Sequence, residues 1–272
     1  MQPEDARSNP IGVFDSGIGG LTVVRALKER LPNENIVYFG DTARVPYGPK
    51  SPQVIREYAA QDTEFLVRNN IKVVVVACNT VSSVALDIVT KHSKVPVVGM
   101  IEPAAEAAAK TSKKKHIGVI GTAATIASKA YVNFIRQIDA SIEVLSKPCP
   151  LFVPLVEEGL LEHRATEIIA REYLFPMKAA KIDTLVLGCT HYPLLRKTIE
   201  LVFDNNISLI DTGEAAAVEV EAILNREKLR NQNMAKGNIQ CYVSDQTPKF
   251  AEIGERFLGE RLGKVRTIRI TD

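Results

Sequence analysis

The features that this sequence lacks exclude several classes of protein. It has no tryptophan and only 6% aromatic residues, and its 34 lysines and arginines nearly balance its 32 aspartates and glutamates. No basic stripe interleaved with aromatic side chains occurs, so composition does not indicate a nucleic-acid partner. No run of about 18 apolar residues occurs, and the first ten residues are polar and mixed in charge, unlike a signal peptide. We therefore expect a cytoplasmic protein with no membrane partner.

Cysteine is also scarce. The four cysteines at positions 78, 149, 189 and 241 form no C-x-x-C pair of the kind that zinc and redox sites use, and the histidines at 92, 116 and 163 show no metal-ligand spacing. A reducing cytosol keeps such cysteines as thiols. We expect no metal site, a free thiol wherever a cysteine matters, and a core or loop position for Cys149 and Cys241.

The balance of 46% hydrophobic and 24% charged residues over 272 positions is typical of a soluble globular protein with room for two modest domains. Short β-branched runs alternate with longer helix-like stretches, a pattern typical of an α/β protein with a mostly parallel sheet. We predict strands near residues 11–14, 36–39, 73–77, 95–98, 117–120, 142–145, 184–187 and 207–210. We predict helices over residues 52–69, 101–111, 124–138, 164–180 and 213–229.

The chain also resembles itself. Residues 11–17 match residues 117–122, and residues 73–80 match residues 184–191, at nearly equal spacing. A duplicated α/β unit explains this better than chance pairing of apolar strands. We predict two pseudo-symmetric α/β domains with an active site in the cleft between them. The first comprises residues 1–100 and 213–272, with a late edge strand over 265–270, and the second comprises residues 101–212.

Each repeat carries one cysteine just beyond the carboxyl end of a buried strand, where open α/β sheets bind ligands. At such a strand-to-helix turn the helix dipole should lower the pKa of Cys78 and Cys189. Asn79 and Thr80 could cap the following helix and offer donors to a ligand. Taken alone, a cysteine after such an apolar run is more often a buried structural thiol, and Cys78 could be one. Two thiols facing one cleft, however, suit a reaction that removes a proton from one face of a carbon and delivers another to the opposite face.

Other side chains could assist this chemistry. Asp15 and His191 are candidates to set the protonation states of the cysteines, and Glu157 could reach His191 or a ligand ammonium group, or only favour a helix start. The turn-rich loop 40–48 could place backbone N–H groups and the Tyr47 region over a small anionic ligand, or be a plain structural turn.

The motifs also allow two other interpretations, dinucleotide binding and serine hydrolysis, which the sequence supports less well. Gly17-Ile18-Gly19-Gly20 after a strand could cradle a dinucleotide phosphate. However, Thr22 replaces the third fingerprint glycine, and Asp15 puts negative charge where the pyrophosphate would lie. A serine hydrolase is poorly supported because no G-x-S-x-G motif occurs.

Six segments together resemble the glutamate racemases of the aspartate/glutamate racemase superfamily. They are F-D-S-G-I-G-G-L at 14–21, D-T-A-R-V-P-Y-G at 41–48, A-C-N-T at 77–80, G-V-I-G-T at 118–122, C-P-L-F-V-P-L-V-E-E-G at 149–159 and G-C-T-H-Y-P at 188–193. The resemblance extends from about residue 11 to 212.

The resemblance implies a cofactor-independent, two-base racemase that forms homodimers and supplies D-glutamate for peptidoglycan. It assigns catalysis to Cys78, facing D-glutamate, and Cys189, facing L-glutamate. It assigns assistance in proton transfer to Asp15, His191 and Glu157. The implied substrate contacts are Asp15, Ser16, Pro46, Tyr47, Gly48, Asn79, Thr80, Thr122, Thr190 and His191. The alternatives are a racemase or isomerase for aspartate or another small acid, and a non-catalytic amino-acid binding protein.

Overall fold

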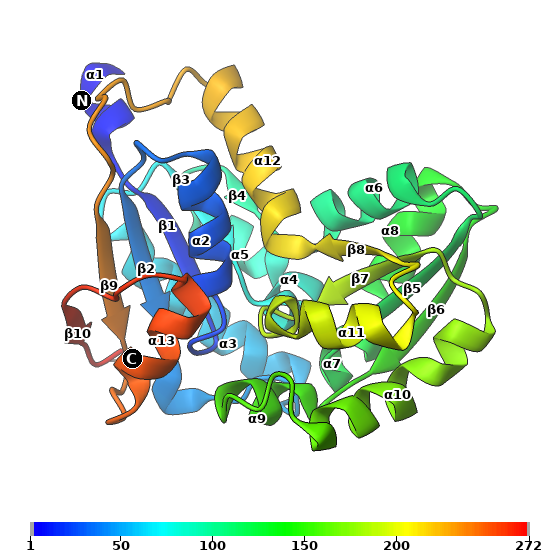
Figure 1. Ribbon diagram of the computed structural model, residues 1–272. Coiled ribbons are helices and arrows are strands. Elements are labelled where there is room, and N and C mark those ends of the chain that lie inside the picture. The colour runs from blue at the N-terminus through cyan, green and yellow to red at the C-terminus, as the bar shows by residue number, and fades with distance from the viewer. Residues whose placement is uncertain (1–2, 271–272) are drawn as a thin grey trace.

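The protein consists of two α/β domains, each built on a parallel sheet, as the computed structural model of residues 3–270 shows (Figure 1). The six-stranded sheet has the order β10-β9-β2-β1-β3-β4, and the four-stranded sheet has the order β6-β5-β7-β8. The strands are β1 (Ile11–Asp15), β2 (Ile36–Gly40), β3 (Val73–Val76), β4 (Val97–Val98), β5 (His116–Gly121), β6 (Glu143–Pro148), β7 (Thr184–Gly188), β8 (Ser208–Asp211), β9 (Ile239–Val243) and β10 (Val265–Thr267).

Helices cover both sheets. The α-helices are α1 (Pro3–Ser8), α2 (Leu21–Arg30), α3 (Pro52–Val67), α4 (Asn79–Val84), α5 (Leu86–His92), α6 (Ile101–Thr111), α7 (Ala123–Ala127), α8 (Ala130–Ile138), α9 (Phe152–Glu157), α10 (Arg164–Ala179), α11 (Arg196–Val202), α12 (Thr212–Arg226) and α13 (Phe250–Leu258), and the 3₁₀ turns are η1 (Thr42–Arg44) and η2 (Tyr192–Leu195). In the central strands β1, β2, β3 and β7 every residue is buried, which is why these segments are apolar without alternation. The predicted α/β class is confirmed.

The internal repeat has a direct structural counterpart. β1 pairs in parallel with β2 and β3, and β5 pairs in the same way with β6 and β7. The order β2-β1-β3-β4 in one sheet therefore corresponds to β6-β5-β7-β8 in the other. Cys78 after β3 and Cys189 after β7 consequently occupy equivalent strand ends in two related domains.

The end of the chain returns to the first sheet. After β8, helix α12 packs on α2 of the first domain and α6 of the second, and β9 then pairs with β2 (Figure 1). The predicted late edge strand is β10, which pairs with β9. The division of the chain at residues 100 and 213 stays a prediction.

One of the predicted helices is divided in the structure. Residues 124–138 were expected to form one helix, but they form α7 and α8, separated at Lys129, whose φ of 57° lies in the left-handed region. Neither glycine nor proline marks this break, so no helix-breaking residue could have indicated it. Among residues 3–270, none of the helices has the length and apolar character needed to cross a bilayer.

Candidate active site

The two equivalent cysteines line one pocket between the domains. Its volume is about 290 Å³. Ligand pockets in proteins typically measure about 300–1,000 Å³, so this pocket is of a size that suits a small molecule. Cys78 is 5% exposed and Cys189 is 6% exposed. Of the site residues predicted from the sequence, only Asp15 does not line this pocket. The predicted residues that line it are Ser16, Pro46, Tyr47, Gly48, Cys78, Asn79, Thr80, Thr122, Glu157, Cys189, Thr190 and His191.

The Cys78 thiol lies in a negative, buried setting. It directly precedes α4 and donates to the Ser16 hydroxyl, with a sulfur-to-oxygen distance of 3.6 Å. Burial, reinforced by the negative charge of Asp15, raises the pKa of Cys78 to about 12. The expectation that the helix terminus lowers this pKa was therefore wrong, because loss of solvent at a 5% exposed sulfur outweighs the dipole of a short helix.

The Cys189 thiol has a cationic neighbour. Its sulfur lies 3.9 Å from Nδ1 of His191, whose Nε2 lies 2.9 Å from Oε1 of Glu157. Burial alone would lower the pKa of His191, but its hydrogen bonds and attraction to Cys189 and Glu157 outweigh burial and raise that pKa to about 10. His191 therefore holds its proton more tightly than a free imidazole does, and its ring lies beside the Cys189 sulfur.

Asp15 ends β1 behind the pocket wall. It is 1% exposed, and its Oδ2 accepts a hydrogen bond from the Gly17 N–H at 3.1 Å. Within residues 3–270, its Oδ1 is a buried oxygen that lacks a hydrogen-bond partner. Burial raises the pKa of Asp15, while the charge of His191 opposes this rise. The carboxyl group of Asp15 and the imidazole of His191 therefore interact electrostatically although they come from different domains.

The loop between β2 and α3 is held by a buried cluster of charges. Tyr47 is 1% exposed, and its hydroxyl donates to Asp41 and Asp62, which are both 0% exposed. Arg44 pairs with both carboxylates. The Tyr47 hydroxyl is thus turned away from the pocket, and the loop borders the pocket through residues 45–49.

Asn79 and Thr80 reach across to the second domain. The Thr80 hydroxyl lies 2.9 Å from the Thr122 hydroxyl, and Asn79 Oδ1 accepts from Tyr131. Cys78 itself occupies the N-cap position of α4. The predicted capping role of Asn79 and Thr80 was therefore wrong, because their side chains bond between domains instead.

Gly19 allows the two domains to approach closely. A Cβ atom at this position would lie 2.2 Å from Oγ1 of Thr190 and 2.6 Å from Nδ1 of His191. The Thr22 hydroxyl donates to the Thr190 carbonyl oxygen beside it, at 2.9 Å. The glycine-rich segment that could have cradled a phosphate instead packs directly against the Cys189 segment.

Part of the pocket wall was not predicted. Apolar side chains complete it: Ile18, Val45, Pro49, Ala123, Pro150, Val153 and Pro154. Most of them stand inside the motifs quoted above, but an apolar residue in a loop carries no signal that distinguishes a pocket wall from a core. Cys149 and Cys241 are buried free thiols, as expected. Among the described residues, no cluster of three or more His, Cys, Asp or Glu side chains could hold a metal ion.

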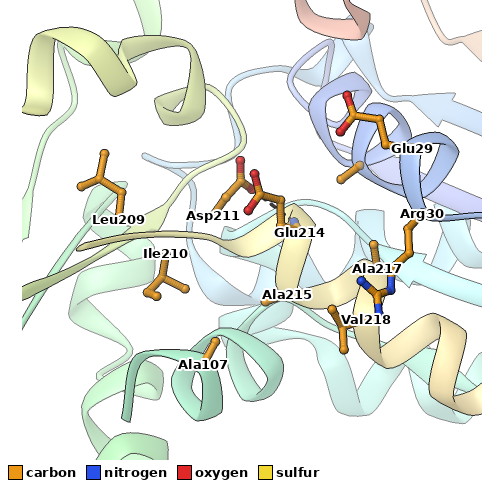
Figure 2. A pocket seen from close by; sticks show the side chains of 11 residues that line it. Glu29, Arg30, Ala107, Leu209, Ile210, Asp211, Glu214, Ala215, Ala217 and Val218 are labelled. Carbon is orange, nitrogen blue, oxygen red and sulfur yellow. Dashed lines mark hydrogen bonds between the residues drawn. The ribbon is translucent and has the colours of Figure 1, made fainter. Parts of the chain in front are cut away.

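A larger cavity, of about 490 Å³, lies elsewhere, among α2, α6, β8 and α12 (Figure 2). It contains no cysteine or histidine. Its polar side chains are Glu29, Arg30, Asp211 and Glu214, and Asp211 caps α12 by accepting from the Gly213 N–H at 2.8 Å. The larger cavity is therefore not the candidate active site, because the thiols, the imidazole and the hydroxyl groups line the smaller pocket.

Two domains related by an internal repeat, with one thiol from each in a shared pocket, define the class of this protein. The chain belongs to the Asp/Glu/Hydantoin racemase family, whose sequence profile matches residues 11–220. It is 49% identical to the glutamate racemase of Chlorobaculum tepidum over 268 residues, which cover 98% of each chain.

Solved structures agree with this assignment. The glutamate racemase of Francisella tularensis in complex with D-glutamate superposes with a TM-score of 0.91 at 40% identity, covering 97% of this chain and 98% of that one. The glutamate racemase isoform RacE1 of Bacillus anthracis superposes with a TM-score of 0.92 at 36% identity, covering 96% and 98%.

Proposed function

We propose that this protein interconverts L-glutamate and D-glutamate by a two-base mechanism without a cofactor, with Cys78 and Cys189 as the two bases. One observation carries the proposal: two cysteines from equivalent strand ends of two related domains border the same pocket. Relatives named glutamate racemase, 45% to 49% identical over nearly the whole chain, support glutamate as the substrate.

The charges around the two thiols support a defined resting state. We infer a resting state in which Cys189 begins as the base and Cys78 as the acid. The imidazole of His191, whose pKa is raised, lies 3.9 Å from the Cys189 sulfur, while burial and the charge of Asp15 raise the pKa of Cys78. In this state the Cys189 thiolate removes the α-proton of the enantiomer that faces it, and the Cys78 thiol delivers its proton to the opposite face. The reverse reaction starts from the opposite protonation state. The family resemblance identifies the enantiomer that faces Cys189 as L-glutamate.

Each cysteine is tested by its own substitution. We expect Cys78→Ala and Cys189→Ala to reduce racemisation at least about 10³-fold in both directions, because each direction needs one thiol as base and the other as acid. The assay is polarimetry from pure L-glutamate and from pure D-glutamate, with circular dichroism to check the fold. Cys149→Ala, which also removes a buried thiol, is the matched control and should keep its turnover. If either catalytic variant keeps more than a few per cent of wild-type turnover, the two-base assignment is wrong.

Two alternatives predict different results. A racemase for aspartate or another small acid would turn over L-aspartate faster than L-glutamate. A non-catalytic binding protein would bind glutamate but leave its α-proton unexchanged in heavy water.

The wider role follows from the same proposal. D-glutamate made by this enzyme supplies peptidoglycan synthesis and cell wall biogenesis. We further propose that the enzyme works in the cytoplasm as a homodimer, which sedimentation of the purified protein tests.

A further inference from the structure

One tyrosine contacts the residues next to both cysteines. Tyr131 lies on α8 in the second domain and is 2% exposed. Its hydroxyl donates to Oδ1 of Asn79, the residue after Cys78, at 2.6 Å. The amide Nδ2 of Asn79 in turn donates to the hydroxyl of Thr212, the first residue of α12, at 3.3 Å. The segment that carries Cys78 is thus tied to the second domain through a buried amide.

The ring of Tyr131 packs on the other cysteine segment. A Cβ atom at Gly188, the residue before Cys189, would lie 3.2 Å from Cε2 of Tyr131 and 2.6 Å from the Ile120 carbonyl oxygen. Gly188 therefore lets the aromatic ring lie directly against the backbone that leads into Cys189. One rigid side chain spans the distance between the two thiol-bearing turns.

We propose that Tyr131 is a positioning residue that fixes the separation of the Cys78 and Cys189 thiols through its hydrogen bond to Asn79 and its ring contact with Gly188. This inference rests on the two-cysteine mechanism proposed above. Tyr131 does not border the pocket, so it acts through the two turns and not on the substrate. A two-base racemase depends on this separation, since both sulfurs must reach the same carbon and a misplacement of about 1 Å can cost about 100-fold in rate.

The test removes the hydroxyl and keeps the ring. We expect Tyr131→Phe to lower kcat about tenfold in both directions while KM changes less than about threefold. The reason is that the hydrogen bond from Tyr131 fixes the distance between the two thiols, while Tyr131 itself makes no contact with the pocket. A second readout is specific to spacing. In heavy water, a misplaced acid prolongs the life of the deprotonated substrate, so the thiol that removed the proton exchanges with solvent. Deuterium should then enter the recovered substrate enantiomer, and its ratio to deuterium in the product should rise.

Tyr192→Phe is the matched control. Tyr192 is fully buried in the second domain, and its hydroxyl donates to the Cys149 carbonyl oxygen at 2.8 Å, so its removal costs a similar buried bond without loosening a contact between domains. We expect its kcat and deuterium ratio to match the wild type. Thr212→Val, which removes the second partner of the Asn79 amide, should shift both quantities in the same direction as Tyr131→Phe and provides the test if that variant does not fold.

The possible results separate the two proposals. Wild-type kcat and an unchanged deuterium ratio in Tyr131→Phe, together with inactive cysteine variants, would overturn the positioning role and leave the two-base mechanism in place. Equal losses in Tyr131→Phe and Tyr192→Phe would also overturn it, since they would reflect general loosening of the fold. Active cysteine variants would instead overturn the underlying mechanism.

Discussion

The charge on His191 gives the sharpest test of the site's electrostatics. Its pKa of about 10, against an ordinary 6.5, depends on Cys189 and on Glu157, whose Oε1 lies 2.9 Å from Nε2. Glu157→Gln keeps the shape of that contact and removes its charge. The Glu157 side chain is 38% exposed, so solvent screens its attraction to His191, and we assign that attraction about 1 kcal/mol. Its loss in Glu157→Gln should lower the pKa of His191 by somewhat less than one.

The sign of the effect follows from linkage. Because the folded protein holds the His191 proton more tightly than the unfolded chain, the resulting stability is present below about pH 6.5 and is lost as pH rises through about 10. In Glu157→Gln this loss should be complete at a lower pH. The alkaline limb of kcat/KM that reports the imidazolium should move down by the same amount.

The measurement is direct, because the chain has only four histidines. Nitrogen-15 resonances of the His191 ring, assigned by comparison with His191→Asn, are followed from pH 6 to 11 in the wild type and in Glu157→Gln. Thermal unfolding over the same range provides the stability curve. An unchanged or higher His191 pKa in Glu157→Gln would refute the electrostatic argument for this side of the pocket.

Two further substitutions probe the scaffold. Gly19→Ala should lower kcat/KM more than tenfold, because a Cβ 2.2 Å from the Thr190 hydroxyl forces the Cys189 segment to move. The control is Gly263→Ala, where a Cβ meets nothing within 4 Å. Equal kinetics in the two variants would contradict this reasoning. Lys72→Met should lower the free energy of unfolding in urea by about 3 kcal/mol with kcat unchanged, because it leaves the 3% exposed Glu34 carboxylate without its cation; a loss below about 1 kcal/mol would show that this buried pair contributes little.

The sequence was most informative where repetition and burial coincide. The predicted strands from residue 11 to 210 correspond to β1 to β8, since a parallel sheet covered on both faces requires continuous apolar runs. The segment 239–243 was harder to interpret because β9 pairs with β2 far back in the chain, and its Gln240 and Tyr242 alternate with buried residues. No local pattern specifies such a distant partner.

The environment of the site could not be predicted in the same way. The sequence locates Cys78 at the end of a strand, but the pKa of its thiol depends on how much of it is buried and on its nearness to Asp15, 63 positions earlier. The same limit explains Tyr131, whose position in an ordinary helical stretch gives no sign that its hydroxyl reaches Asn79 in the other domain. Such long-range contacts follow only from the packing of the finished fold.

The differences between the two halves of the repeat explain how a nearly symmetric scaffold distinguishes its two thiols. At the end of the first strand of each unit, Asp15 corresponds to Gly121, so only the Cys78 side gains a buried carboxyl group. Two positions beyond the cysteines, Thr80 corresponds to His191, so only the Cys189 side gains an imidazole. The duplicated sheets bring both thiols to one pocket, while these two departures from the repeat give the thiols different electrostatic surroundings. A two-base racemase needs both properties, because one thiol must begin as the acid and the other as the base.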